Sequence, residues 1–399
     1  MAKDLILKHT LKNAVDHEGK AHLGAILNKV LGEAPELKKD MKGLANSIKK
    51  AIKEIEDLDP EEQRKKLLKI WPHALDKKEE KEKVLPELLE AKPGKVVVRI
   101  APNANAPLHL GHGLMLTLND EYKKKYKGKL ILRFDDTDPD TKKPIKDVYN
   151  WDIEDIKWFG INPDMIIYAS DRILIYYEVA EKLLDIGQAY VCLCPQEKQQ
   201  AERKDGIACE HRKQSPKENK KLWGEMLNGK FQKGGAVLKI KTDMKHPNPA
   251  IRDWVAFRIT VSPHPRAGKK YKVWPMLDFQ SAVDDHVTGV THILRGKELR
   301  DSTERQKYIY KYMDWKYPEV EYWGRVAIEG LGKISKSDIA NRIQKGNYKR
   351  EDDPVTLAGF RKKGIKPEAI REFFLQMGLT EKDQKASLKI LDAINKRYL

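Results

Sequence analysis

The chain has 399 residues, with 77 lysines and arginines against 60 aspartates and glutamates, which gives a formal net charge of +17. Hydrophobic residues make up 40% of the chain, enough for a buried core, but no apolar run approaches the ~18 residues of a transmembrane helix. Three cysteines are too few for a disulfide framework, and the charged start of the chain lacks the apolar segment of a secretory signal. We therefore expect a cytoplasmic protein with no membrane association and with a polyanionic partner, nucleic acid first.

The first part of the chain predicts helices. Apolar residues recur at helical spacing between Ala45 and Ile55, and Asp59-Pro60 is typical of a helix start. The pattern breaks at 91–94, where proline and glycine follow lysine. The sequence therefore predicts an N-terminal helical domain over residues 1–92.

The next segment changes period. Lys95–Ile100 is a short run rich in β-branched residues, an amphipathic helix follows over Gly113–Tyr126, and Leu130–Phe134 is a second apolar run. Strand, helix and strand in this order predict the βαβ unit of a nucleotide-binding α/β domain.

The domain predictions follow from these changes along the chain. We expect an α/β fold with a Rossmann-type parallel sheet over 93–335. A lysine-rich segment with all three cysteines and broken strands, 190–265, predicts an inserted α+β subdomain. The residues from 336 to 399 predict a helical tail, in which Pro367 begins the clearest helix.

The first segment with chemistry is the loop after the first strand, which leads into His109-Leu110-Gly111-His112 at the start of a helix. Backbone amides at a helix N-terminus and two imidazoles can hold phosphate oxygens, and Gly111 lets a nucleotide approach the backbone. Taken alone, the same residues are compatible with two surface histidines on a loop.

The second segment, Gly332–Asp338, lies about 220 residues further along. Lys333 and Lys336 flank Ser335, and two such lysines can clamp nucleotide phosphates and stabilise negative charge that grows on a leaving pyrophosphate. Taken alone, this segment is compatible with an ordinary basic loop.

Together the two segments resemble the signature pair of class I aminoacyl-tRNA synthetases. Leu132–Pro139 and Val283–Glu298 resemble the corresponding segments of glutamyl- and glutaminyl-tRNA synthetases, and Trp274–Phe279 is similar to a segment of the archaeal type. The chain is identified as a member of the archaeal-type glutamyl-tRNA synthetases, which also carry an N-terminal helical extension.

This resemblance implies the attachment of glutamate to the 3′ end of tRNA through a glutamyl-adenylate, with ATP and its Mg²⁺. The implied catalytic residues are His109, His112, Lys333 and Lys336. The implied ATP-binding residues are these four with Gly111, Glu298 and Ser335. For glutamate they are Arg99, Asn103, Asp135 and Arg295, where Arg99 suits the side-chain carboxylate because its fork can bind a carboxylate bidentately.

The resemblance also implies partners. The insertion is expected to meet the tRNA acceptor end and the residues from 336 onward to contact the tRNA stem. Members of the family continue beyond the position of Leu399 into β-barrels that read the anticodon, so a separate polypeptide is expected to supply them unless the chain is shortened. Whether tRNA for glutamine is charged as well as tRNA for glutamate stays open.

The cysteines form a further constellation. Cys192, Cys194, Cys209 and His211 provide four ligands in two close pairs, which suits one tetrahedral Zn²⁺ with a structural role. The alternative is a set of buried thiols beside an unrelated histidine.

Several alternatives remain at this point. A synthetase-like core can also glutamylate a modified base within tRNA, and a non-catalytic tRNA-binding protein is a third possibility. For Asp284-Asp285, a loop-capping role and a part in the site are equally compatible with the sequence. For Arg133 and Asp138, we expect structural roles rather than contact with the substrate.

Overall fold

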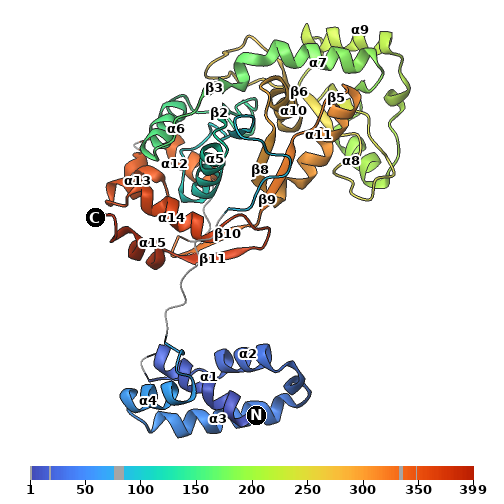
Figure 1. Ribbon diagram of the computed structural model, residues 1–399. Helices are drawn as coiled ribbons and strands as arrows, with labels where there is room; N and C mark the ends of the chain where they lie inside the picture. The colour runs from blue at the N-terminus through green and yellow to red at the C-terminus, as the bar shows by residue number, and fades with distance from the viewer. Residues whose placement is uncertain (1, 18, 76–84, 332–335, 347) are drawn as a thin grey trace. The chain divides into compact units, whose positions relative to one another are not determined.

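The computed structural model describes residues 2–17, 19–75, 85–331, 336–346 and 348–399. Two compact units make up the chain, Met1–Lys81 and Glu82–Leu399 (Figure 1). Among the described residues, no helix is both long enough and apolar enough to cross a bilayer.

The N-terminal unit is built from helices, as the periodicity predicts. Asp59 caps the last of them by accepting hydrogen bonds from the backbone N–H groups of Glu61 and Glu62, each at 2.8 Å, so the predicted helix start is confirmed. The apolar faces meet in a core around Ile26, Val30 and Ile48. In the described part of this unit the α-helices are α1 (Ala2–Asp16), α2 (Leu23–Glu33), α3 (Met41–Glu56) and α4 (Pro60–Ile70).

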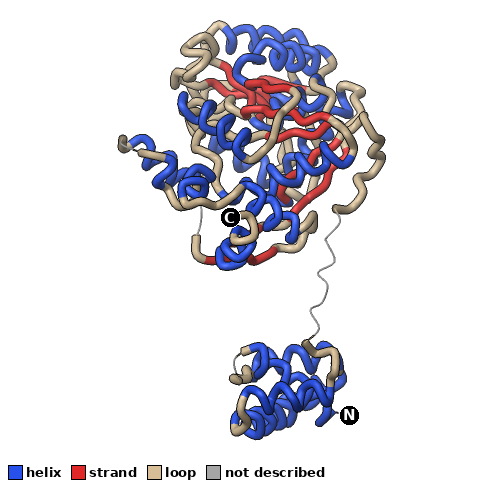
Figure 2. The backbone as a smooth tube through the Cα atoms, turned by 60° about the vertical axis from the view of Figure 1, so that its left-hand side comes forward, coloured by secondary structure: helices blue, strands red, loops and turns tan. Residues whose placement is uncertain are grey.

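The larger unit contains the predicted βαβ arrangement. Three strands pair in parallel in the order β1-β2-β3, and a helix forms each crossover, so the expectation of a parallel sheet is confirmed. β1 and β2 are mostly buried, since helices lie against the sheet, as Figure 2 shows, whereas the edge strand β3 is partly exposed. The elements are β1 (Val97–Ile100), α5 (Gly113–Lys125), β2 (Lys129–Phe134), α6 (Lys146–Trp158) and β3 (Met165–Tyr168).

A second parallel pair lies beside β1. The backbone N–H of Thr291 donates to the carbonyl of Val97 at 3.0 Å, and the Thr291 hydroxyl accepts from the N–H of Val97 at 2.9 Å. These bonds place the start of β8, the first strand of this pair, against the start of β1. The elements are β8 (His292–Gly296), α11 (Arg300–Tyr312) and β9 (Glu319–Trp323).

An antiparallel sheet forms the insertion, in the order β4-β5-β6-β7. Trp223, Trp254 and Phe257 fill its core, which continues onto the helices before and after the sheet. The strands are β4 (Ala189–Cys192), β5 (Val237–Ile240), β6 (Val255–Ile259) and β7 (Val273–Pro275), so the sheet extends beyond residue 265. The helices are α7 (Ile173–Asp185), α8 (Gln196–Asp205), α9 (Pro216–Leu227) and α10 (Leu277–Val287) (Figure 1).

The described residues of the C-terminal segment form helices and one strand. β11 (Gln384–Ser387) pairs in parallel with β10 (Val326–Glu329), a pairing that four mostly polar residues do not signal in the sequence. Phe360, Phe373 and Phe374 pack into the same core as the strands β1 and β2. The helices are α12 (Lys336–Gln344), α13 (Leu357–Lys362), α14 (Pro367–Met377) and α15 (Leu388–Asn395).

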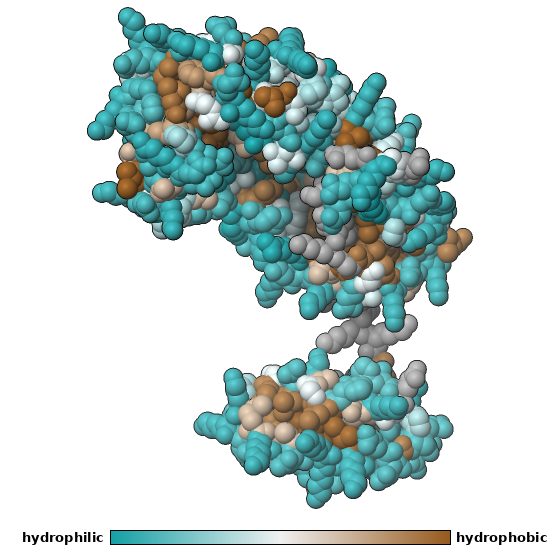
Figure 3. Space-filling view, turned by 180° about the vertical axis from the view of Figure 1, so that it is seen from behind, coloured by the Kyte–Doolittle hydropathy of each residue, from teal (hydrophilic) through white to brown (hydrophobic). Residues whose placement is uncertain are grey.

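The surface of the larger unit reflects its composition. The face shown in Figure 3 is mostly hydrophilic, with scattered apolar residues between the polar ones. A hydrophilic surface of this kind suits a polar or ionic partner.

The contact between α5 and α14 generates a stability prediction. A Cβ added at Gly113 would lie 2.1 Å from Cε2 of Phe374, whereas one at Gly224, also in a helix, would have no heavy atom within 4 Å. We expect Gly113→Ala to lower the free energy of unfolding by about 1–3 kcal/mol through overpacking. Gly224→Ala, the control, should leave it unchanged or raise it by about 0.5–1 kcal/mol. Calorimetric melting of both variants checks this, and equal melting temperatures would contradict it.

Candidate active site

Three arginines gather on the parallel strands of the larger unit. Arg99 lies on β1, Arg133 on β2 and Arg295 on β8, and none is more than 6% exposed. Buried guanidinium groups require carboxylates or other hydrogen-bond acceptors around them. Ligands of open α/β sheets bind at the carboxyl ends of the strands, which is where these side chains lie.

Asp285 joins two of the arginines. Its Oδ1 accepts a hydrogen bond from Nε of Arg99 at 3.1 Å and another from Nη1 of Arg133. Burial alone would raise the pKa of Asp285, but the charges of Arg133 and Arg99 outweigh it and hold the pKa below its usual value. Burial also lowers the pKa of Arg99, although Asp285 opposes this.

Asp284 and Asp285 both belong to α10, so the loop-capping alternative is wrong. Asp284 accepts hydrogen bonds from Nε of Arg172 and from the hydroxyl of Tyr176, each at 2.7 Å. Consecutive residues of a helix point in directions about 100° apart, so the two carboxylates can serve two different arginines. Their role is to neutralise buried cations.

Asp135 lies at the end of β2, next to this cluster. Its Oδ1 accepts from Nε of Arg133 at 2.6 Å and from the side-chain amide of Gln280 at 3.1 Å. The backbone N–H of Asp135 donates to the carbonyl of Pro102, which ties the loops after β1 and β2 together. Arg133 therefore orients the carboxylate, in agreement with the structural role expected of it.

Arg295 is held from the other side of the site. Its Nη1 donates to Oγ1 of Thr303 at 3.2 Å and to Oε1 of Gln306 at 3.1 Å, while its buried Nε has no hydrogen-bond partner among the described residues. The Gln306 side chain is itself fixed, because it accepts from Tyr317 and donates to Ser281. Sequence reasoning missed Gln280 and Gln306, since isolated glutamines in helices carry no motif.

The His109–His112 segment forms a tight turn at the start of α5. Nδ1 of His109 accepts from the N–H of Gly111, and Nδ1 of His112 accepts from the N–H of His109, both at 3.1 Å. With Nδ1 as an acceptor, the proton of each neutral ring lies on Nε2, which is a donor. A Cβ at Gly111 would lie 2.9 Å from Cε1 of His109, so glycine allows the compact turn.

Main-chain bonds tie this turn to the C-terminal segment. The N–H of Leu110 donates to the carbonyl of Val355, and the N–H of Leu357 donates to the carbonyl of Leu108, both at 3.0 Å. Segments that lie about 250 residues apart in the sequence are therefore neighbours. The predictions for Lys333 and Ser335 lie outside the described residues, as does the side chain of Lys336, whose backbone begins α12.

Two further predicted residues lie at strand ends near the site. Asn103 is half-buried in the loop after β1, and Glu298 is exposed in the single turn Lys297–Leu299 that follows β8. A Cβ at Gly296 would lie 2.2 Å from Oε1 of Glu298, so glycine there makes room for this carboxylate. Both positions are compatible with contact to a ligand at the strand ends.

An acidic loop of residues 135–141 follows β2, and the insertion contacts three of its aspartates, one through its main-chain carbonyl and two through their carboxylates. The main-chain carbonyl of Asp136 accepts from Nε2 of His264 at 2.9 Å. Asp138 pairs with Arg258, and Asp140 pairs with Lys233 at 2.8 Å. The acidic loop therefore connects the end of β2 in the parallel sheet to the insertion through these polar contacts.

A basic cavity of about 310 Å³ opens in the insertion, between α8 and the strands β5 and β6. Four cationic side chains line it: Arg203, Lys233, Lys239 and Arg258. Lys239 is 5% exposed, and among the described residues it forms no ion pair or hydrogen bond. Four cations against one lining carboxylate, that of Asp253, favour an anionic occupant.

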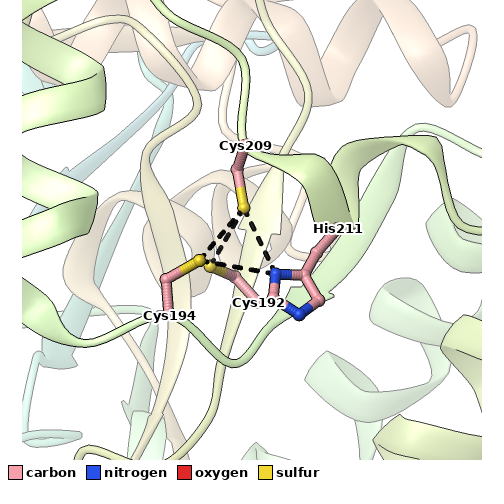
Figure 4. Close-up of side chains that lie close together, drawn as sticks. All are labelled: Cys192, Cys194, Cys209 and His211. Carbon is pink, nitrogen blue, oxygen red and sulfur yellow. Dashed lines mark hydrogen bonds between the residues drawn. The ribbon is translucent and has the colours of Figure 1, made fainter.

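The predicted metal ligands come together at one end of the insertion (Figure 4). Sγ of Cys209 lies 3.6 Å from Sγ of Cys192, 3.4 Å from Sγ of Cys194 and 3.3 Å from Nδ1 of His211. All four ligand atoms lie within 4.8 Å of one another. Zn–S bonds of about 2.3 Å in a tetrahedron require S–S separations slightly below 4 Å, so the four groups fit one Zn²⁺.

Comparison with known proteins agrees with this geometry. Residues 95–399 match the family described as tRNA synthetases class I (E and Q), catalytic domain. A glutamate–tRNA ligase of Archaeoglobus fulgidus is 49% identical over 100% of this chain and 72% of its own length. The corresponding ligase of Pyrococcus furiosus is 48% identical over 99% of this chain and 70% of its own length.

Among solved structures, a glutamate tRNA ligase from Elizabethkingia meningosepticum in complex with its amino acid shares the fold. The TM-score is 0.54 at 22% identity, over 76% of this chain and 69% of that one. The relatives are therefore longer than this chain, which spans roughly seven tenths of their length. Given the matched catalytic domain and this identity over the whole chain, the protein belongs to the class I tRNA synthetase family of the glutamate and glutamine type.

Proposed function

We propose that the protein attaches glutamate to the 3′ end of tRNA in two steps, with ATP as the energy source. Glutamate attacks the α-phosphate of ATP to give glutamyl-adenylate and pyrophosphate, and the glutamyl group then passes to the terminal ribose. The observation that carries this proposal is the 49% identity to a glutamate–tRNA ligase over the whole chain. The buried arginine cluster at the strand ends supports the choice of a dicarboxylic amino acid.

Glutamate presents two carboxylates and one ammonium group, so its pocket needs two cations and one acid. Arg99 and Arg295 supply the cations and Asp135 the acid, with Asn103 beside them. Arg99 is the candidate for the side-chain carboxylate, because Asp285 occupies its Nε and leaves the two Nη groups as a fork. The neutral side-chain amide of glutamine cannot form this charge-assisted pair with a guanidinium group, which disfavours glutamine as a substrate.

The reaction needs no covalent intermediate on a side chain, so positioning and electrostatic stabilisation supply the rate enhancement. His109 and His112 are assigned to the phosphates of ATP as donors through Nε2, with Lys333 and Lys336 as the cations from the second signature. Gly111, Ser335 and Glu298 complete the ATP site, and Mg²⁺ arrives with the nucleotide.

The basic cavity is the part of the insertion best suited to tRNA. Its cations and glutamines can bind the phosphates and bases of an unpaired acceptor end. In this proposal residues 190–265 hold that end, and residues 336–399 contact the stem. The predictions of a separate anticodon-binding polypeptide, of activity on tRNA for glutamine and of a cytoplasmic location remain open to test.

Zinc is proposed as a structural ion. Three thiols and one imidazole form a closed set of four, which leaves no position for a substrate. The cluster joins the end of β4 to the turn Glu210–Lys213. Bound Zn²⁺ would fix both ends of the segment between Cys194 and Cys209, which contains α8, a helix that lines the basic cavity.

The proposed reaction predicts glutamate-dependent exchange of pyrophosphate into ATP when tRNA is present, and a glutamyl ester on the 3′-terminal ribose. Periodate oxidation of the tRNA terminus, which destroys this ribose, should abolish acylation. A glutamyl group on an internal base would instead support base modification. The absence of both exchange and acylation with tRNA present would contradict the proposal.

Arg99→Lys tests the glutamate pocket. The lysine keeps the charge but loses the fork, so we expect KM for glutamate to rise about 10- to 100-fold, the value of one charge-assisted bond. KM for ATP should stay within about twofold, because this side chain is assigned to glutamate only.

The matched control is Arg172→Lys, since Arg172 also pairs with an aspartate of α10 but is assigned no ligand. Its KM for glutamate should stay within about threefold of the wild type. Equal increases in KM for glutamate in both variants would mean that Arg99 acts only through the buried charge cluster.

The metal proposal predicts about one zinc per chain by mass spectrometry of protein purified with zinc present. Cys209→Ser should lose the metal and lower the melting temperature, whereas His246→Ala should retain it, because this histidine lies in the same subdomain outside the cluster. Wild-type protein without zinc at saturating supply would contradict a metal site.

A further inference from the structure

Gln280 lies beside the proposed glutamate pocket, although no ligand is assigned to it. The residue belongs to α10, one helical turn before Asp284, and its side chain is fully buried. Its Nε2 donates to Oδ1 of Asp135 at 3.1 Å and to Oδ2 of Asp284 at 2.9 Å. An amide nitrogen carries two hydrogens, so these two carboxylates use both of them.

The orientation of this amide is fixed by its neighbours. Oε1 of Gln280 is buried and has no hydrogen-bond partner among the described residues. If the amide were turned over, Oε1 would face two carboxylates, from which it could accept no hydrogen bond. The two bonds to carboxylate acceptors therefore outweigh the cost of leaving one buried acceptor unpaired.

The pairing of Asp135 with Arg133 is asymmetric. Nε of Arg133 lies 2.6 Å from Oδ1 of Asp135, whereas Nη2 lies 3.5 Å from Oδ2. A guanidinium group that faces a carboxylate favours two parallel hydrogen bonds. Here the short bonds from Arg133 and Gln280 converge on Oδ1, and Oδ2 keeps only the longer contact.

The second oxygen of Asp135 is suited to a substrate ammonium group. The backbone N–H of Asp135 donates to the carbonyl of Pro102 at 3.0 Å, which restrains the main chain at this position. The residue is 8% exposed, so it is not fully enclosed by the protein. Whether Oδ2 can meet a ligand therefore depends on how the carboxylate is turned relative to Arg133.

We propose that Gln280 is a positioning residue for recognition of the ammonium group of the substrate. Its hydrogen bond to Oδ1 prevents Arg133 from pairing with both oxygens of Asp135 and so keeps Oδ2 available to the ammonium group. Asp284 anchors Gln280 through the second amide hydrogen. The inference rests on the function proposed above, because it takes Asp135 as the acid that meets the ammonium group of glutamate.

A neutral donor suits this position because the charges around it are already paired. A cation at position 280 would compete with the ammonium group for Asp135, and an anion would add a carboxylate beside two others. Burial raises the pKa of Asp284, and the hydrogen bond from Gln280 is one of the contacts that oppose this rise. The ion pairs join three arginines to three aspartates: Arg99, Arg133 and Arg172 to Asp135, Asp284 and Asp285.

Gln280→Met tests the proposal, since methionine keeps the length of the side chain but donates no hydrogen bond. The measurements are the equilibrium dissociation constants of a non-hydrolysable glutamyl-adenylate analogue and of its desamino counterpart, which lacks only the ammonium group, both with a saturating tRNA-Glu transcript. The dissociation constant of the desamino compound divided by that of the amino compound isolates the contribution of the ammonium group.

In Gln280→Met we expect the amino compound to bind about 10-fold more weakly and the desamino compound to stay within about twofold of the wild type, as for the loss of one hydrogen bond to a charged group. The ratio should therefore fall about 10-fold. Gln280→Ala, which also removes side-chain volume, should lower the ratio by the same factor. Equal weakening of both compounds, or an unchanged ratio, in a variant that melts cooperatively would overturn the inference.

The matched control is Gln306→Met, at a second buried glutamine, which holds Arg295 rather than an acid. Both compounds carry the groups assigned to Arg295, so this variant should weaken them by the same factor and keep the wild-type ratio. An equal fall of the ratio in the control would overturn the specific role of Gln280. Failure of the wild type to bind either compound, together with no glutamate-dependent exchange, would instead refute the proposed function.

Discussion

The burial of three arginines beside one another is the constraint on which the site depends. Like charges of this kind are tolerated in a protein interior only if carboxylates lie among them, and α10 supplies two in adjacent positions. Asp285 accepts from both Arg99 and Arg133, so it holds these two side chains together at the level of the pocket. The helix that carries it follows the insertion directly, so the geometry of the pocket depends on how the insertion packs.

Because the pocket is built from segments that are distant in the sequence, many long-range polar contacts surround it. Arg295 reaches Gln306 on the following helix, and Tyr317 holds that glutamine from beyond the helix. Each contact reduces the number of conformations open to a side chain that must meet a charged substrate. A pocket that is ordered before its ligand arrives loses less entropy on binding, which favours discrimination between substrates that differ by one charged group.

The sequence predicts the elements of this fold better than their contacts. The strand at Lys95–Ile100, the helix from Gly113 and the cap at Asp59 are confirmed, because each has a local pattern in apolar spacing or capping residues. The spacing of the cysteines also predicts correctly that Cys192 and Cys209 lie in one cluster. The strand β11 and the partners of Asp284 and Asp285 could not be predicted, since the former is short and polar and the latter depend on packing between distant segments. Glutamines such as Gln280 acquire their importance only from that packing.

The bonds that join the histidine turn to the C-terminal segment use main-chain atoms only. Substitutions at Val355 or Leu357 that keep the backbone path therefore leave them intact, whereas a one-residue insertion or deletion between Asp353 and Leu357 would shift the register. In a bridge of this type a single-residue shift turns each side chain to the opposite face. Across related sequences, the length of this short connection should therefore vary less than its composition.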